Sequence, residues 1–190
     1  CAADGLRWCQ HEATNAAEQV SGVATGDINA DGRLDIVSVT DLGEISWYES
    51  EADGHQWTEH AISTTAVGAR HALLLDVDGD GDLDVATVTD TANDADLVWY
   101  SNDVASNSVF NGPYTIEENL GVSGGAYRLA MAAGNVIGDA KDDIVVVVNN
   151  DRSIRIRGCA NSDCTSSSDW SETSILASGS QIPLADLLDD

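Results

Sequence analysis

The chain has 190 residues, of which 43% are apolar, so it can bury a core of ordinary domain size. It carries 33 acidic and 8 basic residues, and the formal charge of −25 excludes nucleic acid and anionic membrane surfaces as partners, because both attract positive charge. No apolar run approaches the ~20 residues that would span a bilayer, so membrane insertion is not expected. Most of the acidic residues fit a solubilising or salt-adapted surface, but a subset is spaced too regularly for that explanation.

Three segments of the chain repeat one pattern, in which an acidic loop stands between two β-rich runs. They read VATGDINADGRLDIVSVTD (23–41), LLLDVDGDGDLDVATVTD (73–90) and MAAGNVIGDAKDDIVVVVNN (131–150). A fourth copy begins at IPLADLLDD (182–190). The loops follow one another at intervals of about 50 to 60 residues, a period typical of propeller blades.

The stretches between the loops repeat as well. ISWYES (45–50) matches LVWYSN (97–102), and IRIRGC (154–159) follows the third loop. A Trp-x-x-His element recurs in DGLRWCQHEA (4–13) and DGHQWTEHAI (53–62). The segment SSDWSETSIL (167–176) is the same element again, with Trp170 at the tryptophan position. Each unit thus holds four short β-rich runs, which predicts an all-β fold: a β-propeller-type array of four-stranded antiparallel blades.

The repeats also predict the blade boundaries. Full blades are expected at 20–66, 67–124 and 125–178, with the end of a preceding blade at 1–19 and the start of a further one at 179–190. Three full blades and two partial ones are fewer than the 4–8 of most closed propellers. We therefore expect a segment of a longer protein, with copies joined head to tail as the alternative.

The first two acidic loops have the composition of calcium sites. They read D-x-N-x-D-G-x-x-D and D-x-D-x-D-G-x-x-D, so alternate oxygen-bearing side chains turn toward one point, as Ca²⁺ with its 6–8 oxygen ligands requires. A glycine after the third ligand allows the sharp bend. Without a cation, carboxylates this close would oppose joint ionisation. The predicted ligands are the side chains of Asp27, Asn29, Asp31 and Asp35 with the Arg33 carbonyl, and those of Asp76, Asp78, Asp80 and Asp84 with the Asp82 carbonyl.

An EF-hand is the nearest alternative for these loops, and the sequence argues against it. Position 12 of an EF-hand loop is a bidentate glutamate, but Ser38 and Thr87 stand there. Helices should flank such a loop, whereas β-branched runs flank these two.

The third loop has lost part of the pattern. Asn135, Asp139 and Asp143 occupy ligand positions, but Ile137 replaces the second ligand. Ala140 replaces the glycine, and Lys141 brings a positive charge to the position that supplies the carbonyl. We expect this site to be empty or weak, with its turn held by hydrogen bonds.

These loops and strands resemble FG-GAP/VCBS repeats, the units of integrin α-subunit propellers and of many bacterial and algal surface proteins. The Trp-Tyr pair and the Trp-x-x-His element are similar to the VCBS-like branch. The resemblance implies calcium between the first two strands of a blade, a role in adhesion or assembly, and usually seven blades. The sequence departs from the family at the FG-GAP dipeptides, which read ATGD (24–27) and AAGN (132–135).

The four cysteines do not have the C-x2-C spacing usual for zinc. Pairing between near neighbours predicts the disulfides Cys1–Cys9 and Cys159–Cys164, with four free buried thiols as the alternative. Disulfides would place the protein outside the cytosol, at the cell surface or secreted.

The sequence offers little for catalysis. It has no H-E-x-x-H, G-x-S-x-G or phosphate-binding glycine loop. His11 and His60 occupy equivalent positions in repeated units, which favours blade packing, and the other candidates are His55 and His71. Four repeated aromatic residues could stack on sugars, but equal strand positions favour the blade core: Trp47, Tyr48, Trp99 and Tyr100.

We therefore expect a calcium-binding, non-catalytic extracellular surface module for adhesion or structural assembly. Its partner would be a protein or glycan ligand at the cell surface, or copies of itself in a larger assembly. The alternatives are a lectin-like, carbohydrate-binding propeller, which requires exposed aromatic residues beside the loops, and an accessory domain of a larger secreted enzyme.

Overall fold

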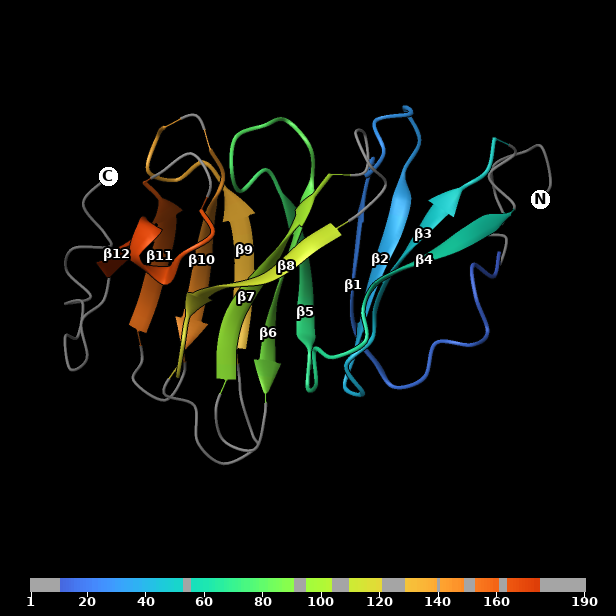
Figure 1. Ribbon diagram of the computed structural model, residues 1–190, viewed down its shortest axis with the longest axis horizontal. Coiled ribbons are helices and arrows are strands. Elements are labelled where there is room, and N and C mark those ends of the chain that lie inside the picture. The colour runs from blue at the N-terminus through green and yellow to red at the C-terminus, as the bar shows by residue number, and fades with distance from the viewer. Residues whose placement is uncertain are drawn as a thin grey trace, which may run out of the picture.

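The computed structural model describes residues 11–52, 56–90, 95–103, 110–120, 129–139, 141–148, 153–160 and 164–174. Within these ranges the chain forms three four-stranded antiparallel sheets, each with its strands in sequence order (Figure 1). We call them the first, second and third blades.

The first blade contains β1 (Val20–Gly26), β2 (Asp35–Thr40), β3 (Ile45–Ser50) and β4 (Trp57–Ser63). The second contains β5 (Arg70–Leu75), β6 (Asp84–Asp90), β7 (Ala95–Asn102) and β8 (Phe110–Glu117). The third contains β9 (Leu129–Gly134), β10 (Asp143–Val148), β11 (Ser153–Cys159) and β12 (Trp170–Ser174). One 3-10 turn, η1 (Ser167–Asp169), stands directly before β12.

The predicted all-β array of four-stranded antiparallel blades is thus confirmed. Each sheet lies inside one of the segments predicted as a full blade. The segments expected to be partial blades are described only at 11–19, which carries no strand. No helix in the described part of the chain is long and apolar enough to cross a bilayer.

The blades lie side by side along the molecule, with the first strand of each at their junctions. β5 contacts β1 on one side and β9 on the other, and Figure 1 shows the three strands running through the middle of the array. Apolar side chains from facing blades form two buried clusters. The first joins the first two blades and includes Val37, Val39, Trp47, Ala72, Val85 and Tyr100. The second joins the last two blades and includes Leu97, Trp99, Ile144, Val146 and Cys164.

The repeated aromatic residues belong to this core. Trp47 lies opposite Val37 in the first blade, and Trp99 lies opposite Ala86 at the equivalent place in the second. The exposed fractions of Trp47, Tyr48, Trp99 and Tyr100 are 4%, 3%, 0% and 2%. These four rings therefore do not offer the exposed surface that stacking on a sugar needs.

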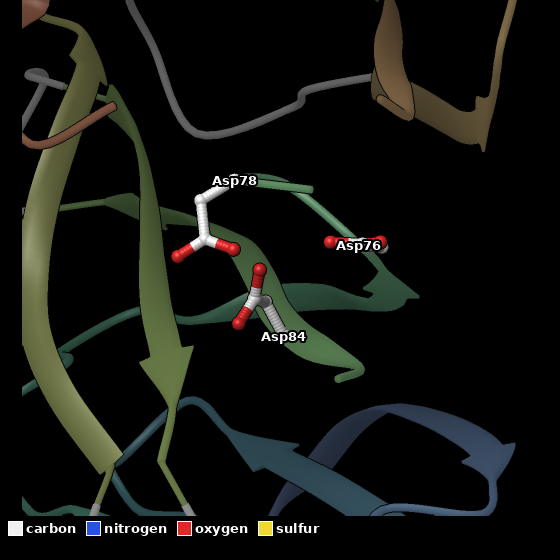
Figure 2. A group of neighbouring side chains, drawn as sticks. All are labelled: Asp76, Asp78 and Asp84. Atoms are coloured by element: carbon white, nitrogen blue, oxygen red, sulfur yellow. The ribbon is translucent and has the colours of Figure 1, made fainter. Parts of the chain in front are cut away.

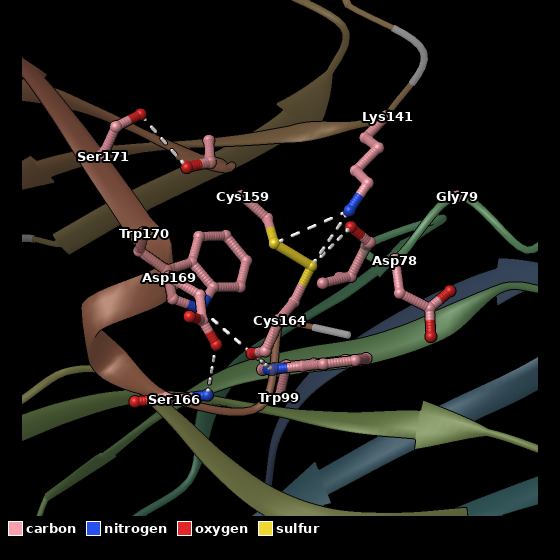
Figure 3. Close-up of a disulfide and its surroundings, with 12 residues drawn as sticks. Asp78, Gly79, Trp99, Lys141, Cys159, Cys164, Ser166, Asp169, Trp170 and Ser171 are labelled. Carbon is pink, nitrogen blue, oxygen red and sulfur yellow. Dashed lines mark hydrogen bonds between the residues drawn. A yellow bond between two sulfur atoms is a disulfide. The ribbon is translucent and has the colours of Figure 1, made fainter. Parts of the chain in front are cut away.

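The predicted disulfide Cys159–Cys164 is present, and Cys1 and Cys9 lie outside the described residues. Cys164 is fully buried where the second and third blades meet (Figure 3). Its carbonyl accepts hydrogen bonds from Trp99 Nε1 (3.1 Å) of β7 and Trp170 Nε1 (3.2 Å) of β12. The disulfide thus holds a residue that joins two blades.

Candidate metal sites in the acidic loops

The two acidic loops occupy equivalent places, because one joins β1 to β2 and the other joins β5 to β6. The glycines after the third predicted ligands adopt the left-handed backbone that the bend requires, with φ of 85° at Gly32 and 96° at Gly81. Residues with a Cβ rarely adopt this backbone conformation. The predicted ligand order is therefore compatible with the observed turn in both loops.

In the first loop, side-chain oxygens accept backbone hydrogen bonds that hold the turn. Asp27 accepts from the amides of Asp31 (3.0 Å) and Gly32 (2.9 Å). Asp31 accepts from the Arg33 amide (2.9 Å), and its carboxylate also pairs with the Arg33 guanidinium. Asn29 accepts from the Asp31 amide at 3.2 Å. Three of the four side chains predicted as ligands thus hold the turn by hydrogen bonds, but among the described residues this loop does not bring three acidic side chains together.

The second loop brings three predicted ligands together. Each of Asp76, Asp78 and Asp84 offers a carboxylate oxygen, and these three oxygens lie within 4.8 Å of one another (Figure 2). Asp80 also belongs to the turn, since it accepts from the Asp82 amide at 2.8 Å. Such a set of hard oxygen donors suits Ca²⁺ or another oxygen-seeking cation.

The last aspartate of each loop is a buried bridge between the loop and the third strand. Asp35 accepts from the amides of Ile28 (3.1 Å) and Ser50 (2.9 Å), the latter in β3. Asp84 accepts in the same way from Val77 (2.9 Å) and from Asn102 (2.8 Å) in β7. Each carboxylate oxygen has two lone pairs, so it can accept an amide and still contact a cation.

Burial and crowding disfavour the charged forms of these carboxylates. Desolvation raises the pKa of Asp84 to about 8, against the lowering effect of its two backbone hydrogen bonds. Desolvation is also the largest cause of the raised pKa values of Asp35, Asp78 and Asp82, and neighbouring aspartates add to it. A cation would relieve this penalty by stabilising the ionised forms.

The pKa of Asp84 predicts how the metal-free protein responds to pH. A folded-state pKa near 8, above the ordinary 3.8, contributes stability that is fully present below about pH 4 and is lost as pH rises through 8. In chelator-containing buffer, the melting temperature of the wild type should therefore exceed that of Asp84→Ala by less at pH 9 than at pH 6. Thermal scans of both proteins across this range measure the difference, and a constant gap would contradict the prediction.

The third loop keeps the buried aspartate but not its bond to the third strand, because Asp143 Oδ1 has no hydrogen-bond partner among the described residues. Asp143 accepts from the amides of Val136 and Ile137, both at 2.7 Å. Asn135 accepts from the Gly138 amide (2.7 Å), and Asp139 accepts from the Lys141 amide (2.9 Å). Hydrogen bonds thus hold this turn, as expected for a loop that has lost ligand positions.

Two side chains beside the loops were not predicted from the sequence as part of a site. Glu49 of β3 accepts from Asn29 Nδ2 at 3.0 Å and so orients a predicted ligand. Lys141 was assigned to the third loop, but its side chain extends to the disulfide and the second loop (Figure 3). Glu49 could have been suspected from its place in the repeated ISWYES run. Lys141 carries no such signal, because its contacts lie on another blade.

Of the histidine candidates, His60 has the best-defined surroundings. Its ring stacks on Trp47 with centroids 4.3 Å apart, and Nε2 lies 3.0 Å from Glu49 Oε2. His60 therefore takes part in blade packing. His55 lies outside the described residues.

Comparison with known proteins identifies the repeat. Residues 27–87 match the family model of the FG-GAP-like repeat. The match begins at the first residue of the first loop and ends in β6, so it includes both acidic loops. No curated protein matches the chain. The chain thus carries an FG-GAP-like repeat, and the resemblance predicted from the sequence is confirmed over the segment that holds both loops.

Proposed function

We propose that the chain is a calcium-binding, non-catalytic propeller module that acts outside the cell in adhesion or structural assembly. The observation that carries the proposal is the convergence of Asp76, Asp78 and Asp84 in a turn whose equivalent recurs in the first blade. Calcium binds through several hard oxygens in flexible geometry. The loops of both blades provide such oxygens between the first and second strands.

The remaining parts of the proposal rest on further features. The Cys159–Cys164 bridge favours an oxidising compartment, because cytosolic thiols are kept reduced. His60, one of the histidine candidates for catalysis, is engaged with Trp47 and Glu49. The chain has a formal charge of −25, so a protein or glycan ligand would bind it through basic groups on the ligand or through the bound cations. Copies of the chain are the other proposed partner.

Calcium titration tests the proposal. We expect two sites, each with a Kd of roughly 10⁻⁴–10⁻³ M, as is typical of extracellular modules. At about 10 mM calcium, a site with a Kd of about 10⁻⁴ M stabilises the fold by about 2.7 kcal/mol, and one with a Kd of about 10⁻³ M by about 1.4 kcal/mol. The melting temperature should therefore fall in EDTA and recover with millimolar calcium, and isothermal titration calorimetry should report the stoichiometry.

Matched variants make this test specific. Asp27→Ala and Asp76→Ala should each remove one of the two sites. Glu44→Gln, which removes an exposed carboxylate from the β2–β3 turn, should leave both sites unchanged. Magnesium at equal concentration should substitute poorly, since it demands near-ideal octahedral geometry and keeps its water. The absence of both binding heat and thermal shift in the wild type would refute the proposal.

A further inference from the structure

The third loop packs against the second loop from the neighbouring blade. The Asp142 amide donates to the Asp76 carbonyl (3.1 Å), and the Asp76 amide donates back to Asp142 Oδ2 (3.2 Å). Asp76 is the first predicted ligand of the second loop. Two hydrogen bonds between residues 66 positions apart therefore hold the backbone of this ligand.

Lys141, the residue before Asp142, lies over the second loop. A Cβ added to Gly79 would stand 3.2 Å from Lys141 Cγ and 3.5 Å from Cε, so the lysine stem crosses the loop where Gly79 has no side chain. Lys141 Nζ lies 3.3 Å from Cys164 Sγ and 3.7 Å from Cys159 Sγ (Figure 3). Cys164 Sγ in turn lies 3.5 Å from the carbonyl of Val77. The ammonium group is thus held beside the second loop by the disulfide and by the packing of its own stem.

The charge of Lys141 acts on a predicted ligand. Gly79, over which the lysine stem passes, stands between the predicted ligands Asp78 and Asp80. A fixed positive charge stabilises carboxylates when no metal is bound. The same charge repels a divalent cation that would bind there.

The first loop has a negatively charged neighbour on the third strand of its own blade. Glu49, two residues after Trp47, accepts from Asn29 and adds a negative charge. The equivalent residue of the second blade is Ser101, two residues after Trp99. At the second ligand position, the first loop therefore has the amide of Asn29 with the Glu49 carboxylate beside it. The second loop has the carboxylate of Asp78 with the Lys141 side chain nearby.

We propose that Lys141 is an affinity-determining residue of the second cation site, which it reaches from the third blade. The inference rests on the proposed function, since it needs a cation in that loop. Lys141 weakens cation binding to the second loop and stabilises the loop without a cation. It thereby lowers the affinity of this site for a cation.

The test is a calcium titration of Lys141→Gln in an Asp27→Ala background, where only the second site binds. Removing the positive charge should lower the calcium Kd by about threefold or more. The same change should lower the melting temperature in EDTA. This combination separates an electrostatic role from a structural one, because a variant that merely disturbs the loop would lose both affinity and stability.

Two further variants complete the experiment. Lys141→Arg keeps the charge and should retain the parent affinity. Arg70→Gln removes the same charge from the start of β5, about 20 Å of extended strand away from the loop, and should also leave the Kd unchanged.

The outcomes are distinct. If the Asp27→Ala parent binds no calcium while Asp76→Ala binds it, the second site is absent and the inference falls while the first site stands. If neither binds, the proposed function falls as well. If the parent binds and Lys141→Gln shows an equal or weaker affinity, only the role of Lys141 is overturned.

Discussion

Replacing Asp84 by alanine is expected to lower the free energy of unfolding by about 3 kcal/mol at pH 6, even in the presence of a chelator. Asp84 is fully buried and accepts hydrogen bonds from the amides of Val77 and Asn102. Alanine leaves both amides without this acceptor, and each unsatisfied buried group costs about 1–3 kcal/mol. Urea denaturation followed by tryptophan fluorescence measures the loss.

Asp80→Ala is the matched control for this variant. Asp80 is a predicted ligand of the same loop, but it is exposed and, among the described residues, accepts a hydrogen bond from the Asp82 amide alone. Its replacement should change the stability of the chelated protein by no more than about 0.5 kcal/mol. Both variants should weaken calcium binding at the second loop. Equal destabilisation by the two substitutions in chelator would show that the bridge formed by Asp84 has no special role.

Replacing Arg157 by alanine should also cost about 3 kcal/mol, for a different reason. Arg157 of β11 has a side chain only 6% exposed, and it joins the second and third blades through Glu117 of β8. Nε donates to Glu117 Oε2 at 2.9 Å, while an Nη atom lies 2.8 Å from Glu172 Oε2. Its removal leaves Glu117 partly buried with only one of its two arginine partners, Arg155.

A double-mutant cycle identifies this interaction. If the ion pair carries the effect, Arg157→Ala combined with Glu117→Ala should cost clearly less than the two single variants added together. Arg155→Ala, which removes the other arginine that contacts Glu117, should cost less than Arg157→Ala because the Arg155 side chain is more exposed. Additive costs at Arg157 and Glu117 would contradict the prediction.

Much of the fold could be predicted from the sequence because the chain repeats its own pattern. Alternating and β-branched runs mark strands, and three copies show which variation is tolerated. The two loops could be predicted for the same reason, since a turn of alternating aspartates has few other uses. The Cys159–Cys164 pair is close in sequence, and a short loop readily closes.

The features that escaped prediction depend on contacts between blades. Lys141 and Asp142 touch the second loop across more than sixty residues of chain, and no pattern near them indicates their neighbour. Arg157 stands where the other blades have Tyr48 and Tyr100, so its pairing with Glu117 depends on the stacking of two blades. The double use of Asp35 and Asp84, as predicted ligands and as buried acceptors, likewise becomes visible only when the third strand is in place.

The last aspartate of each loop has a consequence for how such a repeat can diverge. In all three blades this residue begins the second strand and accepts from an amide of its own loop, including in the third blade, where other ligand positions have changed. Because the turn is fastened to the blade by an anchor independent of the outer ligands, those ligands can be exchanged without dismantling the sheet. A duplicated blade is therefore free to lose its own cation and to acquire a new task, such as shaping the loop of its neighbour.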